Sequence, residues 1–146
     1  MSELHEALLR GLAPGGVMWL KAAGNSLWPL LRDGDSLKVE RVSEAQLHLG
    51  DVAIVKLPSG ILAAHLVAGL MPLRTASSVG VLDPLPLEAL GRVVGFRRDG
   101  VERDWPALSR LALRFLPVAA RALKRVPLGR RLVRRLRDSL GLPSRD

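Results

Sequence analysis

The chain has 146 residues, 48% of them hydrophobic, which is enough for one globular domain with an appendage and too little for a second full domain. It contains no cysteine, which excludes disulfides, thiolate catalysis and cysteine-bound metals, and its three histidines are too scattered to predict a metal site. Only 3% of the residues are aromatic, so the chain offers little for stacking on exposed bases. We therefore expect no cofactor and no metal, and the composition disfavours single-stranded nucleic acid as a partner.

The net charge of +8 is unevenly distributed along the chain. Residues 103–146 hold 12 of the 22 Lys and Arg residues but only 3 of the 14 acidic residues, so the basic character belongs to the C-terminal segment. The first residues carry acidic side chains where an export signal needs basic ones, and no apolar run reaches the roughly 18 residues of a membrane span. These features predict a cytoplasmic protein, or a cytoplasmic protein that lies peripherally at a membrane.

The predicted elements begin with a short helix over 3–12, where apolar residues recur at helical spacing. The run 17–22 (VMWLKA) predicts a strand. The run 37–42 (LKVERV) alternates apolar and polar side chains, which is typical of a half-exposed strand. Between these two strands, residues 24–35 (GNSLWPLLRDGD) predict a compact turn.

The rest of the body also predicts strands joined by tight turns. In chain order we expect a short link at 43–47, a hairpin of strands 52–57 and 61–67, a strand at 70–75, a loop over 76–86 and a strand at 90–98. Strand follows strand with no crossover helix. The pattern therefore predicts a mainly β, coiled antiparallel fold over residues 1–102.

From Trp105 the apolar period changes from two to three and four, and arginines line another side of the pattern. Residues 103–146 thus predict a basic amphipathic helical tail, interrupted by prolines. Three roles stay open for residues 105–140: they lie on an anionic membrane, they bind a partner protein or nucleic acid, or their apolar stripes pack on the body.

The turn at 24–35 holds the strongest candidate for chemistry, Ser26. Gly24 permits backbone geometries closed to other residues, and Pro29 fixes φ just after the serine. A nucleophile needs such support, because its hydroxyl must meet a carbonyl at one angle. The same residue types also make ordinary loops.

A serine needs a base near neutral pH, and His65 is the candidate. It lies in the apolar run 61–67, where an unpartnered imidazole would cost about 1–3 kcal/mol. Two interpretations are open: a core histidine bonded to a backbone carbonyl, or the base for Ser26. Lys38 and Lys56 are weaker candidates, because both are expected at solvated positions where lysine is protonated.

The order of several segments carries a family resemblance over about residues 17–100. The series G-N-S-L-W-P-L-L-R-D-G-D, V-E-R-V, L-G-D-V-A-I-V-K, A-A-H-L-V and L-G-R-V-V-G-F-R-R-D-G resembles the signal peptidase I and repressor-cleavage superfamily of serine peptidases. It is most similar to the branch that uses a histidine base. The transmembrane helix that precedes the serine in membrane-bound signal peptidases has no counterpart in the expected elements. The resemblance implies the coiled β-fold of these peptidases and a serine endopeptidase that removes a leader or signal segment.

The resemblance also implies residue roles. Ser26 matches the nucleophile and His65 the base, and Asp83 falls where the histidine branch has the acidic residue that orients the histidine. The backbone at Gly24, Asn25 and Ser26 is the expected oxyanion site. The substrate would be an extended peptide with small side chains near the scissile bond, added as a β-strand.

Some positions depart from the family pattern. Leu27 replaces the usual Met in a substrate-groove or core position, with Pro29 as a second groove candidate, and Leu66 stands where the histidine branch has Arg. The run 75–78 (TASS) replaces an expected K-G-D segment. Asp83 is therefore the single remaining acidic candidate, and before Pro84 it is equally well a turn former.

Two other functions are weighed against the peptidase. A self-cleaving regulator is disfavoured, because 25 residues before Ser26 are too few for a helix-turn-helix domain and a cleavage segment. A non-catalytic scaffold, with its arginine-rich tail as the binding element, is the main alternative.

Overall fold

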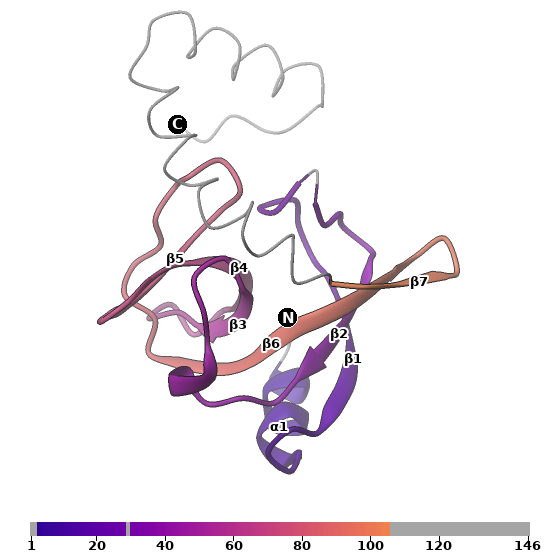
Figure 1. Cartoon of the computed structure of the whole chain (residues 1–146), viewed down its shortest axis with the longest axis horizontal. Helices are drawn as coiled ribbons and strands as arrows, with labels where there is room; N and C mark the ends of the chain where they lie inside the picture. The colour runs from indigo at the N-terminus through magenta and orange to yellow at the C-terminus, as the bar shows by residue number, and fades with distance from the viewer. Residues whose placement is uncertain (1–2, 29, 106–146) are drawn as a thin grey trace, which may run out of the picture.

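The computed structural model describes residues 3–28 and 30–105, so Pro29 and the predicted tail from residue 106 onward lie outside the described residues. The elements are α1 (Glu3–Gly11), β1 (Val17–Lys21), β2 (Ser36–Glu40), the 3-10 turn η1 (Glu44–Gln46), β3 (Val52–Lys56), β4 (Leu62–Leu70), β5 (Leu73–Ala76), β6 (Glu88–Arg98) and β7 (Val101–Asp104) (Figure 1). The predictions of a mainly antiparallel β-structure and a short N-terminal helix are confirmed. Within residues 3–28 and 30–105, no helix combines the length and the apolar character that a bilayer crossing needs.

The strands form one antiparallel sheet in the order β1-β2-β6-β3-β4-β5, and β7 pairs with β6. The long strand β6 pairs with β3 through its first residues and with β2 through its later ones, so it joins the β1–β2 pair to the β3–β5 group (Figure 1). At the change of partner, a Cβ on Gly91 would lie 2.8 Å from both the Glu40 carbonyl oxygen and Val39 Cγ1. Only glycine allows this close approach.

Two apolar clusters fill the coiled sheet. The larger one joins Leu9 of α1, Leu27 and Leu31 of the turn after β1, and side chains of β1, β2, β3, β4 and β6. The smaller one joins Val42 and Leu47, on either side of η1, with Val55, Val67 and Leu73 of β3, β4 and β5. Each fully buried leucine or valine contributes about 1.5–3 kcal/mol to folding. The clusters therefore fix how α1 and the turn after β1 sit against the sheet.

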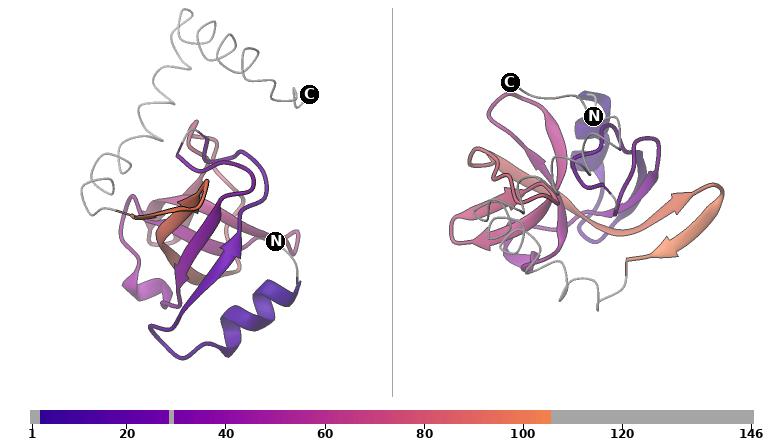
Figure 2. Two further views of the ribbon diagram at one scale, coloured as in Figure 1. Left: turned by 90° about the vertical axis from the view of Figure 1, so that its right-hand side faces the viewer. Right: turned by 90° about the horizontal axis from the view of Figure 1, so that it is seen from above.

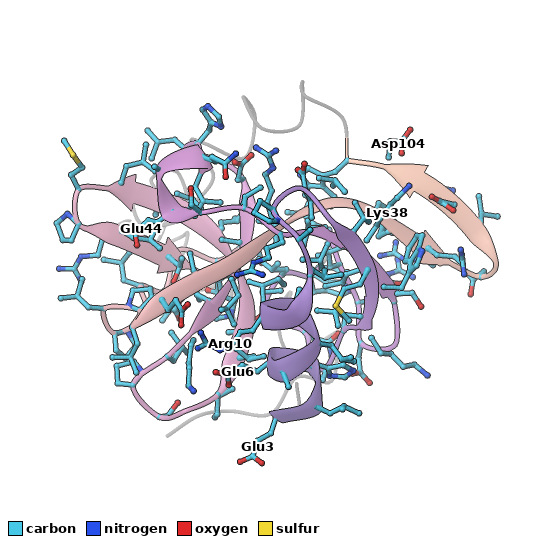
Figure 3. All side chains as sticks on the ribbon, turned by 90° about the horizontal axis from the view of Figure 1, so that it is seen from below. Glu3, Glu6, Arg10, Lys38, Glu44 and Asp104 are labelled. Carbon is cyan, nitrogen blue, oxygen red and sulfur yellow. The ribbon has the colours of Figure 1, made fainter. Side chains whose placement is uncertain are left out.

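Helix α1 is tied to the sheet by an ion-pair network. Arg10 pairs with Glu6 at 2.9 Å and with Glu88 of β6 at 2.6 Å, and Lys56 of β3 pairs with Glu6 at 2.8 Å. Figure 3 shows Glu6 and Arg10 on the same side of α1. Arg41 donates to the carbonyls of Arg10 and Leu12, which have no helical partner where α1 ends.

The sheet extends past the predicted boundary at residue 102. Strand β7 forms a hairpin with β6 that projects from the rest of the sheet (Figure 2). Beyond it, the backbone N–H of Trp105 donates to the Val94 carbonyl at 2.8 Å. The indole ring of Trp105 packs edge-on against Phe96, with the ring centroids 6.0 Å apart. Trp105 thus packs on the body, at the residue where the helical sequence pattern begins.

Candidate active site

Ser26 lies in a tight turn between β1 and β2. The Trp28 N–H donates to the Asn25 carbonyl at 3.1 Å, and the N–H groups of Leu30 and Leu31 donate to the Leu27 carbonyl at 2.9 and 3.1 Å. In this helical turn Leu27 and Leu31 are four residues apart, so both point into the core, while Ser26 is exposed. Leu27 is 3% exposed and belongs to the larger apolar cluster, so of its two predicted positions the core one is confirmed and the substrate-groove one is wrong.

The first residues of the turn are closed by polar contacts. Gly24 has φ +87°, a backbone conformation that favours glycine, as the sequence predicted. Its N–H donates to Asp33 Oδ1 at 2.9 Å, and the Asp33 N–H donates to Asn25 Oδ1 at 3.2 Å. Gly24 is therefore not a free oxyanion donor. The backbone N–H groups of Asn25 and Ser26 make no hydrogen bond to other described residues.

The last residue of the turn, Asp35, is anchored by Arg98 at the end of β6. Arg98 Nε and Nη2 donate to the two carboxylate oxygens of Asp35 at 2.9 and 2.6 Å, and Nη2 also donates to the Leu30 carbonyl at 3.1 Å. Burial raises the pKa of Asp35, but the hydrogen bonds from Arg98 and from the Arg32 N–H outweigh it, so the pKa lies below its usual value. The turn is thus fixed to the sheet by a buried ionised carboxylate.

His65 reaches Ser26 from strand β4. Its Nε2 lies 2.9 Å from Ser26 Oγ, and its Nδ1 lies 2.6 Å from Asp83 Oδ2. The side chain of His65 is 12% exposed and that of Asp83 is 11% exposed. Both ring nitrogens thus face side-chain oxygens, which contradicts the interpretation of His65 as a core histidine bonded to a backbone carbonyl.

Asp83 is held by strand β5. Its N–H donates to the Thr75 carbonyl at 3.0 Å, and the Thr75 hydroxyl donates to its Oδ2 at 2.6 Å. Burial raises the pKa of Asp83, but the hydrogen bonds from His65 and Thr75 outweigh it and lower the pKa from 3.8. An ionised carboxylate only accepts hydrogen bonds, so we infer that His65 Nδ1 carries a proton. In the neutral imidazole, Nε2 then accepts from the Ser26 hydroxyl.

The turn after β5 contacts the turn that carries Ser26. Ser78 is buried, its N–H donates to the Ser26 carbonyl at 3.0 Å, and its hydroxyl reaches the carbonyls of Trp28 and Ser26 at 2.7 and 3.2 Å. The run 75–78, where the resemblance predicts K-G-D, therefore supplies two residues that contact the site, Thr75 and Ser78. Sequence reasoning missed Thr75 and Ser78, because hydroxyl side chains at the end of a short strand and in the turn after it carry no distinctive signal.

The two lysines weighed as bases lie elsewhere. Lys38 pairs with Glu102 at 3.0 Å, and Lys56 pairs with Glu6 at 2.8 Å. Each ammonium group is occupied by a carboxylate, whereas His65 is the side chain within hydrogen-bond reach of Ser26 Oγ.

Comparisons with known proteins yield nothing: no family model, no curated protein and no solved structure matches this chain. The chemistry of the site therefore has to follow from its own geometry, in which Ser26, His65 and Asp83 form one hydrogen-bonded series.

Proposed function

We propose that this protein is a serine endopeptidase that removes a leader or signal segment from a peptide or protein. One observation carries the proposal: the hydrogen bonds from Ser26 Oγ to His65 Nε2, at 2.9 Å, and from His65 Nδ1 to Asp83, at 2.6 Å. The three side chains come from a turn, a strand and a loop that are far apart in the sequence. Nucleophile, base and orienting carboxylate in this order are the arrangement that acyl transfer requires.

In the proposed mechanism, Ser26 Oγ attacks the scissile carbonyl carbon while His65 Nε2 takes the hydroxyl proton. The Asp83 carboxylate stabilises the imidazolium that forms. As the C–N bond breaks, His65 protonates the leaving amine and Ser26 keeps the acyl group. A water molecule, deprotonated by His65, then attacks the ester and releases the second product.

The oxyanion of the tetrahedral intermediate would be bound by backbone donors of the turn. The N–H groups of Asn25 and Ser26 are the candidates, because neither is used by another described residue. Donors held in place before reaction stabilise developing charge without reorganisation, and one such donor typically contributes about 2.7–4 kcal/mol.

The sheet edge beside Ser26 supports an extended substrate. Among the described strands, β1 pairs with β2 alone, so its other edge is open and leads directly into the Ser26 turn. An extended peptide added to this edge would bring its carbonyl groups past Ser26. Exposed apolar residues also flank Asp83 on both sides: Val79, Val81, Leu82, Leu85 and Leu87. A substrate with apolar side chains matches this surface, and the resemblance adds that the side chains near the scissile bond are small.

Cleavage of candidate leader peptides by purified protein tests the proposal. Ser26→Ala and His65→Ala should each lower kcat by at least about 10³-fold. The first change removes the attacking hydroxyl, and the second removes the imidazole that accepts its proton. Ser59→Ala is the matched control, since Ser59 is exposed in the turn between β3 and β4 and lies outside the site. Mass spectrometry should detect an acyl adduct on Ser26. Equal cleavage by all four proteins would leave the scaffold as the better explanation.

A further inference from the structure

Thr75 is the only threonine in the chain, and its side chain is fully buried. Valine has nearly the same shape, suits a β-strand equally well and brings no polar atom into the interior. A buried hydroxyl at this position must therefore be compensated by a hydrogen bond. That bond goes to Asp83 Oδ2, at 2.6 Å, the same oxygen that lies 2.6 Å from His65 Nδ1.

The sheet register explains why these groups meet. Thr75 of β5 is directly opposite Val67 of β4, so the two side chains share a face, and His65 precedes Val67 by two residues on that face. The chain then turns back, and Leu82 bridges to Ala76 beside Thr75. The Thr75 carbonyl holds the backbone of Asp83 and its hydroxyl holds the carboxylate. Asp83 is therefore fixed at two points by one residue.

We propose that Thr75 is a positioning residue that holds the Asp83 carboxylate in line with His65 Nδ1. The inference rests on the proposed function and deepens it by adding a fourth member to the hydrogen-bonded series. Among the described residues, the Thr75 hydroxyl has its hydrogen bond with Asp83 and none with Ser26, so the proposed role acts through Asp83. Without its hydroxyl, the carboxylate is free to rotate away from Nδ1, and small misplacements of catalytic groups cost up to about 10²-fold in rate.

Kinetics of Thr75→Val and Thr75→Ser test this role. Thr75→Val should lower kcat by about 10–100-fold and leave KM within about twofold, because the substrate contacts are unchanged. Thr75→Ser keeps the hydroxyl and should retain at least about a third of the wild-type kcat. In an Asp83→Asn background, Thr75→Val should lower kcat by less than about threefold further, because the group through which Thr75 acts is already altered.

Proton NMR supplies a readout that does not depend on peptidase activity. The low-field Nδ1–H resonance of His65, assigned by its loss in His65→Ala, should shift or broaden in Thr75→Val and remain in Thr75→Ser. If wild type cleaves no leader but the resonance responds in this way, the proposed function fails and the positioning role stands. Thr75→Ala serves as a second hydroxyl-free variant if Thr75→Val does not fold, as judged by circular dichroism.

Three results would overturn the inference. One is an unchanged resonance and kcat in the hydroxyl-free variants. Another is a Thr75→Ser protein as impaired as Thr75→Val, which would mean that shape and not the hydroxyl matters. The third is that Thr75→Val lowers kcat in the Asp83→Asn background by the same factor as in the wild-type background.

Discussion

The two sides of the candidate site are built differently. Ser26 is exposed on a turn, and the turn is held from a distance by buried leucines, by Ser78 and by the Asp35–Arg98 pair. His65, Thr75 and Asp83 are buried or nearly so and belong to the strands β4 and β5 and the loop after them. The His65 imidazole and the Asp83 carboxylate are thus held by the sheet and the loop after it, whereas the Ser26 hydroxyl lies on a separately anchored segment. Damage to the first side should alter chemistry, and damage to the second should first alter stability.

The largest loss of activity is expected from a change to Asp83, the carboxylate that pairs with His65. Asp83→Asn keeps the shape of the side chain, but its amide can donate to Nδ1 and so favours the tautomer in which Nε2 carries the proton. That tautomer cannot accept the Ser26 proton, so kcat should fall by about 10³–10⁴-fold. Leader cleavage measures the change. Asp99→Asn in the exposed β6–β7 turn is the control, and a comparable loss in both variants would contradict the orienting role of Asp83.

The next largest effect is a loss of stability when the Asp35–Arg98 ion pair, which anchors the Ser26 turn, is removed. Arg98→Met leaves the buried Asp35 carboxylate without its ion-pair partner, which should lower the free energy of unfolding by about 3–5 kcal/mol. Arg97→Met is the matched control one residue earlier in β6, where the side chain is 45% exposed and its ion pair with Glu102 is worth at most about 1 kcal/mol. Urea unfolding compares the two variants. Equal stability would show that Asp35–Arg98 does not anchor the turn.

The smallest expected effect is the pH dependence of stability, to which one carboxylate on each side of the site, Asp35 and Asp83, contributes. The pKa of Asp35 and that of Asp83 lie below the usual value of 3.8 in the folded protein. Their contribution to stability is therefore fully present above the unfolded-state pKa and is lost as pH falls through the folded-state values. The free energy of unfolding should decrease below about pH 4, by at most about 1.4 kcal/mol per pH unit for each group. Urea unfolding of Asp35→Asn should show a shallower acid slope than wild type, and identical slopes would remove Asp35 as a source.

Local pattern was enough to predict much of the body. Alternation over residues 37–42 and the apolar runs at 52–57 and 61–67 predicted strands that the structure contains, with ends shifted by at most three residues. Strand β7 was missed, because its four residues are all exposed and carry no apolar period. The boundary of the strand region could not be found from the sequence for the same reason.

The candidate site was only partly accessible from sequence. Ser26, His65 and Asp83 were singled out by turn chemistry, by a histidine in an apolar strand and by resemblance, and the structure brings these three together. The supporting contacts were not found, because a bond such as Arg98 to Asp35 joins positions 63 residues apart and leaves no local signal. Leu27 was left open between a groove and a core position, since sequence does not tell which face of a helical turn points inward.

Strand β6 has a consequence for how the protein matures during synthesis. Ser26, His65 and Asp83 all leave the ribosome before β6 does, yet β6 is the strand that links the β1–β2 pair to the β3–β5 group and ends in Arg98. Before residues 88–98 emerge and insert, the Ser26 turn can be held near β5 only by contacts such as those of Ser78. Among the described strands, the β1–β2 pair then has no strand partner in the β3–β5 group, and Asp35 lacks Arg98. Under the proposed function, a nascent or truncated chain that stops before this point should therefore cleave little or no leader peptide, because its site is not yet fully anchored.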